Sequence, residues 1–114
     1  MKVSEIVKLL NGRILSGEDK SDMEVEVACA SDLMSDVLTL KSDNVLLITG
    51  LNNVSTVRTA EMSDIHCVIL ARNKRANVEM LELARENSLI IIECPYSVFK
   101  TCGILFQAGI KPIF

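Results

Sequence analysis

The chain has 114 residues, which is enough for one domain over residues 1–114 but not for two. Hydrophobic residues make up 49% of it and aromatic residues only 4%, so a disordered chain is excluded and the core must be aliphatic. The formal net charge of −3 does not provide the basic surface of a nucleic-acid-binding protein, so we expect no nucleic-acid partner.

The N-terminal residues and the apolar runs predict where the protein is found. Met1 is followed by charged residues rather than by the apolar segment of a signal peptide. No apolar run approaches the ~18–20 residues that a membrane-spanning helix needs. We therefore expect a cytoplasmic protein with no membrane partner.

The beginning of the chain predicts one short helix and one short strand. Apolar residues at helical spacing predict a helix over residues 4–10, with Ser4 as its N-cap. Asn11 and Gly12 tolerate a left-handed backbone and are expected to end this helix. Arg13–Ser16 follows as a short strand.

A second strand and a second helix are predicted next. Apolar and acidic residues alternate at the start of residues 23–30, which predicts a half-exposed strand that becomes buried near Cys29. Ser31 or Asp32 is expected to cap the following helix, and residues 41–43 to form a surface turn.

The rest of the chain repeats a buried strand followed by a helix. Continuous apolar runs predict strands at Val45–Thr49, 67–71 and 89–92. Polar residues then cap the helices that follow: Asn52 or Asn53, Asn77, and Ser97. The last helix is expected to turn four residues inward: Val98, Cys102, Leu105 and Phe106. This order predicts an α/β fold in which a mainly parallel central sheet lies between two layers of helices, with residues 111–114 as an edge strand or a docked tail.

A candidate ligand site follows from this arrangement, because ligands bind open α/β sheets beyond the carboxyl ends of their strands. One strand ends in a glycine turn at a helix start, a geometry suited to an anion. The next strand ends in a basic loop. The candidate ligand-binding residues are Thr49, Gly50, Asn52, Asn53, Arg72, Asn73 and Lys74. Helix capping and a solvated loop explain the same residues, so both interpretations stay open.

The sequence contains no evident catalytic set, cofactor motif or metal motif. His66, the only histidine, precedes a strand at the edge opposite the candidate site. The acidic pairs Glu24/Glu26 and Glu79/Glu82 lie on faces predicted to point outward. The four cysteines form no CxxC pair, which favours buried reduced thiols over a zinc site. We therefore expect no catalytic residues, no cofactor and no bound metal.

The chain resembles the DRTGG domain family over nearly its whole length. The resemblance is carried by the order of its segments: Ile14-Leu15-Ser16-Gly17, Leu46-Leu47-Ile48-Thr49-Gly50, Val68-Ile69-Leu70, Leu81-Glu82-Leu83-Ala84 and Cys94-Pro95-Tyr96-Ser97-Val98-Phe99. The residues that name the family are replaced by Leu51-Asn52 and Ala71-Arg72-Asn73. DRTGG domains are similar to the N-terminal domain of HPr kinase/phosphorylase. They also occur in bacterial phosphotransacetylases and beside CBS domains.

This resemblance implies a regulatory or assembly domain, often homo-oligomeric, with no catalytic residues to carry over. It favours a stand-alone non-catalytic module that forms a homodimer and binds a small anionic ligand, a nucleotide or a protein partner. The apolar end at Ile113 and Phe114 agrees with a dimer contact. Two alternatives stay open: a small phosphotransfer-related enzyme, and a structural subunit of a larger metabolic complex.

Overall fold

The computed structural model describes residues 1–40 and 44–114, so the turn predicted at 41–43 lies outside the described residues. Within them, a six-stranded sheet has the order β1-β5-β4-β3-β2-β6. The strands are β1 (Arg13–Ser16), β2 (Val27–Ala30), β3 (Val45–Thr49), β4 (Cys67–Leu70), β5 (Ile90–Glu93) and β6 (Lys111–Pro112). The helices are α1 (Val3–Leu9), α2 (Met34–Val37), α3 (Val54–Met62), α4 (Val78–Glu86) and α5 (Val98–Gln107), with a short 3-10 turn at Glu18–Lys20.

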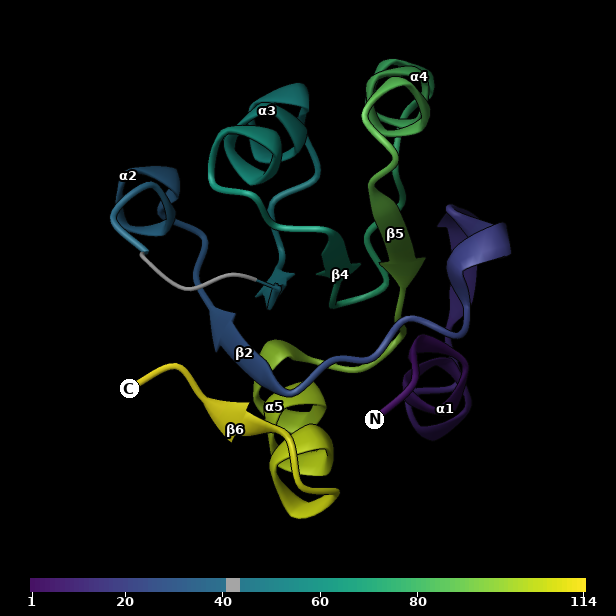
Figure 1. Cartoon of the computed structure of the whole chain (residues 1–114), viewed down its shortest axis with the longest axis vertical. Helices are drawn as coiled ribbons and strands as arrows, with labels where there is room; N and C mark the ends of the chain where they lie inside the picture. The colour runs from purple at the N-terminus through teal and green to yellow at the C-terminus, as the bar shows by residue number, and fades with distance from the viewer. Residues whose placement is uncertain (41–43) are drawn as a thin grey trace.

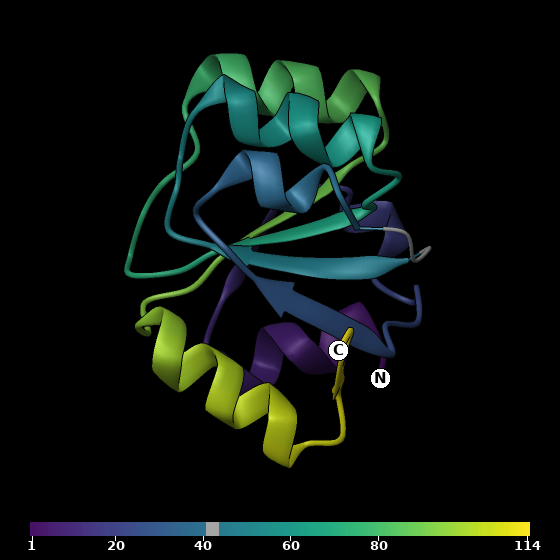
Figure 2. The ribbon, with the colours of Figure 1, turned by 90° about the vertical axis from the view of Figure 1, so that its left-hand side faces the viewer.

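Helices cover both faces of the sheet. The helices α2, α3 and α4 lie on one face, and α1 and α5 lie on the other (Figures 1 and 2). All neighbouring strands are parallel except β1, which runs antiparallel to β5. The predicted three-layer α/β fold with a mainly parallel sheet is therefore confirmed.

The continuous apolar runs are explained by burial on both faces of the sheet. In β3 and β4, Leu47 lies beside Val68 and Ile48 lies beside Ile69. Because successive side chains of a strand point to opposite faces, Ile48 and Ile69 pack with α1 and α5, while Leu47 and Val68 pack with the other three helices. Neither face could be exposed without leaving several aliphatic side chains in water.

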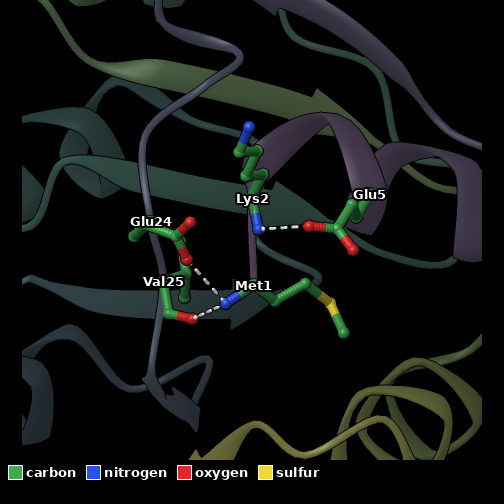
Figure 3. A network of polar contacts seen from close by, with 5 residues as sticks. All are labelled: Met1, Lys2, Glu5, Glu24 and Val25. Carbon is green, nitrogen blue, oxygen red and sulfur yellow. Dashed lines mark hydrogen bonds and ion pairs between the residues drawn. The ribbon is translucent and has the colours of Figure 1, made fainter.

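The segment before β2 does not form the strand predicted at 23–30. Glu24 makes an isolated antiparallel bridge with Lys2, and the strand itself begins only at Val27. The terminal amine of Met1 donates to the Glu24 carboxylate and to the Val25 carbonyl oxygen, both at 3.0 Å (Figure 3). These residues are thus paired with the start of the chain rather than with the sheet.

Two predicted N-caps are wrong, because the first helix begins earlier and the second helix begins later than the sequence indicates. The first helix begins at Val3, and the carboxylate of Glu5 accepts a hydrogen bond from the Lys2 N–H at 3.1 Å, so Ser4 is not its cap (Figure 3). In the next helix the N-cap is Leu33, and the Ser31 hydroxyl accepts from its N–H. The caps at Asn53, Asn77 and Ser97 are confirmed.

The last helix turns fewer residues inward than predicted. Leu105 is buried, and Val98 and Cys102 are half-buried, but Phe106 is 67% exposed. The helix ends where expected, at a left-handed Gly109 with φ of 107°. The chain then adds β6 at the edge of the sheet, parallel to β2, as one of the two predicted alternatives for residues 111–114. In the described part of the chain, no helix has the length and apolar character to span a bilayer.

Candidate functional site

The carboxyl ends of the parallel strands meet at one edge of the sheet. Four loops leave this edge, one each after β2, β3, β4 and β5, and they are joined to each other by backbone hydrogen bonds. The N–H of Ala71 donates to the Thr49 carbonyl oxygen at 2.8 Å, and the N–H of Arg72 donates to the Tyr96 carbonyl oxygen at 2.7 Å. The predicted site residues therefore belong to one connected surface.

The glycine turn after β3 already holds a carboxylate. One oxygen of Asp32, from the loop after β2, accepts from the Gly50 N–H at 2.7 Å and from the Thr49 hydroxyl at 2.8 Å. Thr49 Oγ1 accepts in turn from the N–H of Leu51. The donors expected to bind an external anion thus bind a side chain of the protein itself.

Hydrogen bonding changes the acidity of this carboxyl group. The Gly50 N–H lowers the pKa of Asp32 below its usual value, and the Thr49 hydroxyl and the charge of Arg72 act in the same direction. Desolvation opposes them and is outweighed. Asp32 is therefore ionised at neutral pH and presents a fixed negative charge beside the basic loop.

The basic loop after β4 lies directly against the glycine turn. The guanidinium of Arg72 is 3.5 Å from the Gly50 carbonyl oxygen, and a Cβ added at position 50 would lie 2.6 Å from its Nη2. A glycine at position 50 is therefore what leaves room for Arg72. Both Arg72 and Asn73 have a left-handed backbone, with φ of 61° and 59°, and the N–H of Asn73 donates to the Cys94 carbonyl oxygen.

The other predicted site residues have local roles. The side chain of Asn52 donates to the Arg75 carbonyl oxygen at 3.0 Å and so joins the two loops. Asn53 turns into its own helix, where its side-chain oxygen accepts from the Thr56 N–H. Lys74 is half-buried, and its N–H donates to the Ala71 carbonyl oxygen. The structure thus brings Thr49, Gly50 and Arg72 together, and connects Asn52 to the same loop.

The sequence did not predict two of the charged residues at this edge of the sheet, Asp32 and Lys100. Asp32 was expected to cap a helix, although it follows a strand whose end lies at the same edge as Gly50. Lys100 lies on α5 with its Nζ 4.0 Å from the centre of the Tyr96 ring. Since the Tyr96 carbonyl oxygen accepts the hydrogen bond from the Arg72 N–H, Lys100 adds a cation beside the same pair of loops. The signal for Asp32 was its place directly after β2, but using it requires the strand order.

The residues judged unrelated to a site lie on the surface. His66 is exposed at the amino end of β4, as predicted. The acidic residues Glu24, Glu26, Glu79 and Glu82 are exposed, as predicted. Among the described residues, no group of three histidine, cysteine, aspartate or glutamate side chains could hold a metal ion.

The four cysteines are free thiols, but they differ in burial. Cys67 and Cys94 are buried, as predicted, whereas Cys29 and Cys102 are only half-buried. Burial raises the pKa of the Cys67 thiol to about 12, so almost none of it is thiolate at neutral pH.

Cys67 is therefore expected to resist iodoacetamide in the folded protein and to react only after unfolding in urea. Mass spectrometry of the labelled peptides measures the rate at each thiol. Labelling of Cys67 in the absence of urea at the rate of a free thiol would contradict its burial.

Fold and site together define an α/β domain whose parallel strands end in polar and basic loops. The sequence model of the DRTGG domain matches residues 5–108, so the chain belongs to the DRTGG domain family. This confirms the resemblance noted in the sequence. A comparison with curated proteins gives no match.

A solved structure shares the fold. It is the crystal structure of the CBS and DRTGG domains of the regulatory region of Clostridium perfringens pyrophosphatase, complexed with its activator, diadenosine tetraphosphate. The TM-score is 0.79 at 14% sequence identity, over 95% of this chain and 47% of that one. The present chain thus spans about half the length of that solved chain.

Proposed function

We propose that this chain is a non-catalytic regulatory module, a single domain over residues 1–114 that acts as a homodimer and binds a small anionic ligand of the nucleotide class. Membership of the DRTGG family and a structural neighbour from a regulatory region support the regulatory role. One observation carries the ligand proposal: the basic loop at Arg72 is held in a strained conformation beside the Gly50 turn.

The strain is informative because a left-handed backbone costs a non-glycine residue about 1–2 kcal/mol. Arg72 and Asn73 both adopt it in sequence, and backbone hydrogen bonds to the loop after β5 hold them there. Strain of this kind is retained where it positions a side chain for function. Here it holds a guanidinium beside Gly50, in a loop that also contains Lys74 and Arg75.

The position of Asp32 limits how an anion would bind. Its carboxylate occupies the Gly50 N–H and the Thr49 hydroxyl, so a phosphate would contact Arg72 and the neighbouring cations rather than the turn itself. The charge of Asp32 also weakens the attraction for a second anion. Removing that charge should therefore strengthen binding.

Thermal unfolding with a panel of anions tests the ligand proposal. Inorganic phosphate, AMP, ATP and diadenosine tetraphosphate are the probes, and a ligand that binds only the folded state raises the melting temperature as its concentration exceeds Kd. At least one nucleotide is expected to stabilise the protein, and Asp32→Asn is expected to enlarge the shift. A flat response to all four probes overturns the ligand part of the proposal.

Arg72→Gly separates binding from folding. Glycine accepts a left-handed backbone, so the free protein is expected to gain about 1 kcal/mol of stability while the ligand-induced shift is lost. Arg58→Ala removes the same charge from an exposed position on α3 and serves as the matched control, which should keep the shift. An equal loss in both variants would point to non-specific charge attraction.

A further inference from the structure

All three phenylalanines of the chain lie on its surface around one groove. Phe99 is 90% exposed, Phe106 is 67% exposed and Phe114 is 96% exposed. The groove has a volume of about 480 Å³ and lies between α5, β2 and the C-terminal segment, which run on the same side of the molecule (Figure 1). Phenylalanine is among the residues most often buried, so three exposed rings in one place indicate a surface that a partner covers.

The groove has the composition of an interface centre. Its lining includes one charged side chain, that of Lys111, and is otherwise apolar or small. Charged residues are depleted and aromatic residues are enriched at the centre of protein interfaces. Charge complementarity therefore does not define the partner of this surface.

The edge strand beside the groove is closed to strand addition. The N–H groups of Lys111 and Ile113 both donate inward, to the carbonyl oxygens of Glu26 and Ala28. Between them, Pro112 has no N–H to offer outward. A partner must therefore dock through side chains rather than by extending the sheet.

The same surface offers both projections and a hollow, which is what a two-fold symmetric interface requires of a single patch. Aromatic side chains bury about 150 Å² or more each, so three rings contribute on the order of 450 Å² per copy. A stable interface buries ~800 Å² per partner, so the three rings supply about half of it, and the groove together with the surface around it must supply the rest. Two copies of this chain can thus bury each other's exposed phenylalanines without a third component.

A glycine in α5 allows close approach. Gly103 is exposed in the middle of the helix and lines the groove, and a Cβ added there would meet nothing within 4 Å. Glycine is unfavourable inside a helix, and the fold of one chain does not require it here. A flat position on the helix is useful when another surface packs against it.

We infer that the groove between α5 and residues 110–114 is the face through which two copies of this chain pair, with the phenylalanines of each copy packed into the groove of the other. The inference rests on the homodimer of the proposed function and is independent of its anionic ligand. The interface is isologous, so a single substitution changes both halves of it.

The test is the mass of the whole chain in solution, measured by light scattering and sedimentation equilibrium. The natural sequence is expected to be a dimer at about 100 μM, well above a micromolar Kd. Phe99→Asp and Gly103→Gln, each with the circular dichroism of the folded protein, should raise the dissociation constant at least tenfold. Val78→Asp changes an apolar residue that is 70% exposed on the opposite layer and should leave the dimer intact.

The outcomes separate the two proposals. A natural chain that is monomeric at this concentration overturns the homodimer together with its face, and leaves the groove to a partner of another kind. A dimer that survives both Phe99→Asp and Gly103→Gln overturns this face alone. Dissociation by Val78→Asp to the same extent also overturns it.

Discussion

Gly17→Ala is expected to lower the free energy of unfolding by about 2–4 kcal/mol, since it combines backbone strain with overpacking. Gly17 follows β1 with a left-handed backbone, at φ of 81° and ψ of 28°. An added Cβ would lie 2.7 Å from Cγ1 of Ile90 and 3.1 Å from its Cα, so the alanine cannot be accommodated by rotating a side chain. The melting temperature should fall by roughly 10–20 °C.

The loss should affect the edge of the sheet first. Immediately before the glycine, the buried hydroxyl of Ser16 donates to the Leu89 carbonyl oxygen at 2.9 Å, and a shift of Gly17 would break this bond. Urea unfolding followed by circular dichroism gives the change in free energy. Gly109→Ala is the control, because Gly109 also has a positive φ but has nothing within 4 Å of an added Cβ. It should lose about 1 kcal/mol, the cost of the backbone alone; equal losses in the two variants would contradict the steric argument.

Asp32→Ala is expected to cost about 1–2 kcal/mol at neutral pH. A hydrogen bond to a charged group contributes about 1.5–3 kcal/mol, and the two bonds from Thr49 and Gly50 are weakened by the exposure of this carboxylate to solvent. Asp22→Ala, at an exposed aspartate in a turn, is the matched control and should change the stability by less than about 0.5 kcal/mol.

The effect of Asp32 should depend on pH in one direction. The pKa of Asp32 is lower in the folded protein, so its contribution is fully present above the pKa of the unfolded chain and is lost as the pH falls through the folded value. The difference between the natural protein and Asp32→Ala should therefore shrink on acidification below about pH 4, the ordinary range of an aspartate. Urea unfolding at a series of pH values measures it, and a difference that grows toward low pH would refute the assignment.

The elements that the sequence predicted well are those set by local pattern. The strands at Val45–Thr49, 67–71 and 89–92 agree with the structure to within a residue at each end, because a strand buried on both faces must be continuously apolar. The caps at Asn77 and Ser97 are equally local, since each side chain bonds to an N–H of its own helix. Helices, parallel strands and their order along the chain follow from these features.

The features that were missed depend on contacts between distant segments. Asp32 bonds to Gly50 only because β2 lies next to β3, and no local pattern gives that order. Phe106 lies beside Leu105 at the border of the buried stripe of α5, where spacing alone does not decide between core and surface. Whether Arg72 and its neighbours bind a ligand stays a prediction, since their hydrogen bonds describe a shaped loop and not its occupant.

The antiparallel edge of the sheet also has a consequence for how the chain folds. Arg13 lies opposite Glu93, and among the described residues the one strand that pairs with β1 is β5, the last strand but one along the chain. Contacts between such distant residues form slowly, and during synthesis the partner strand leaves the ribosome late. The N-terminal strand must wait for it, so in the nascent protein this edge is expected to close only after β2, β3 and β4 have been made.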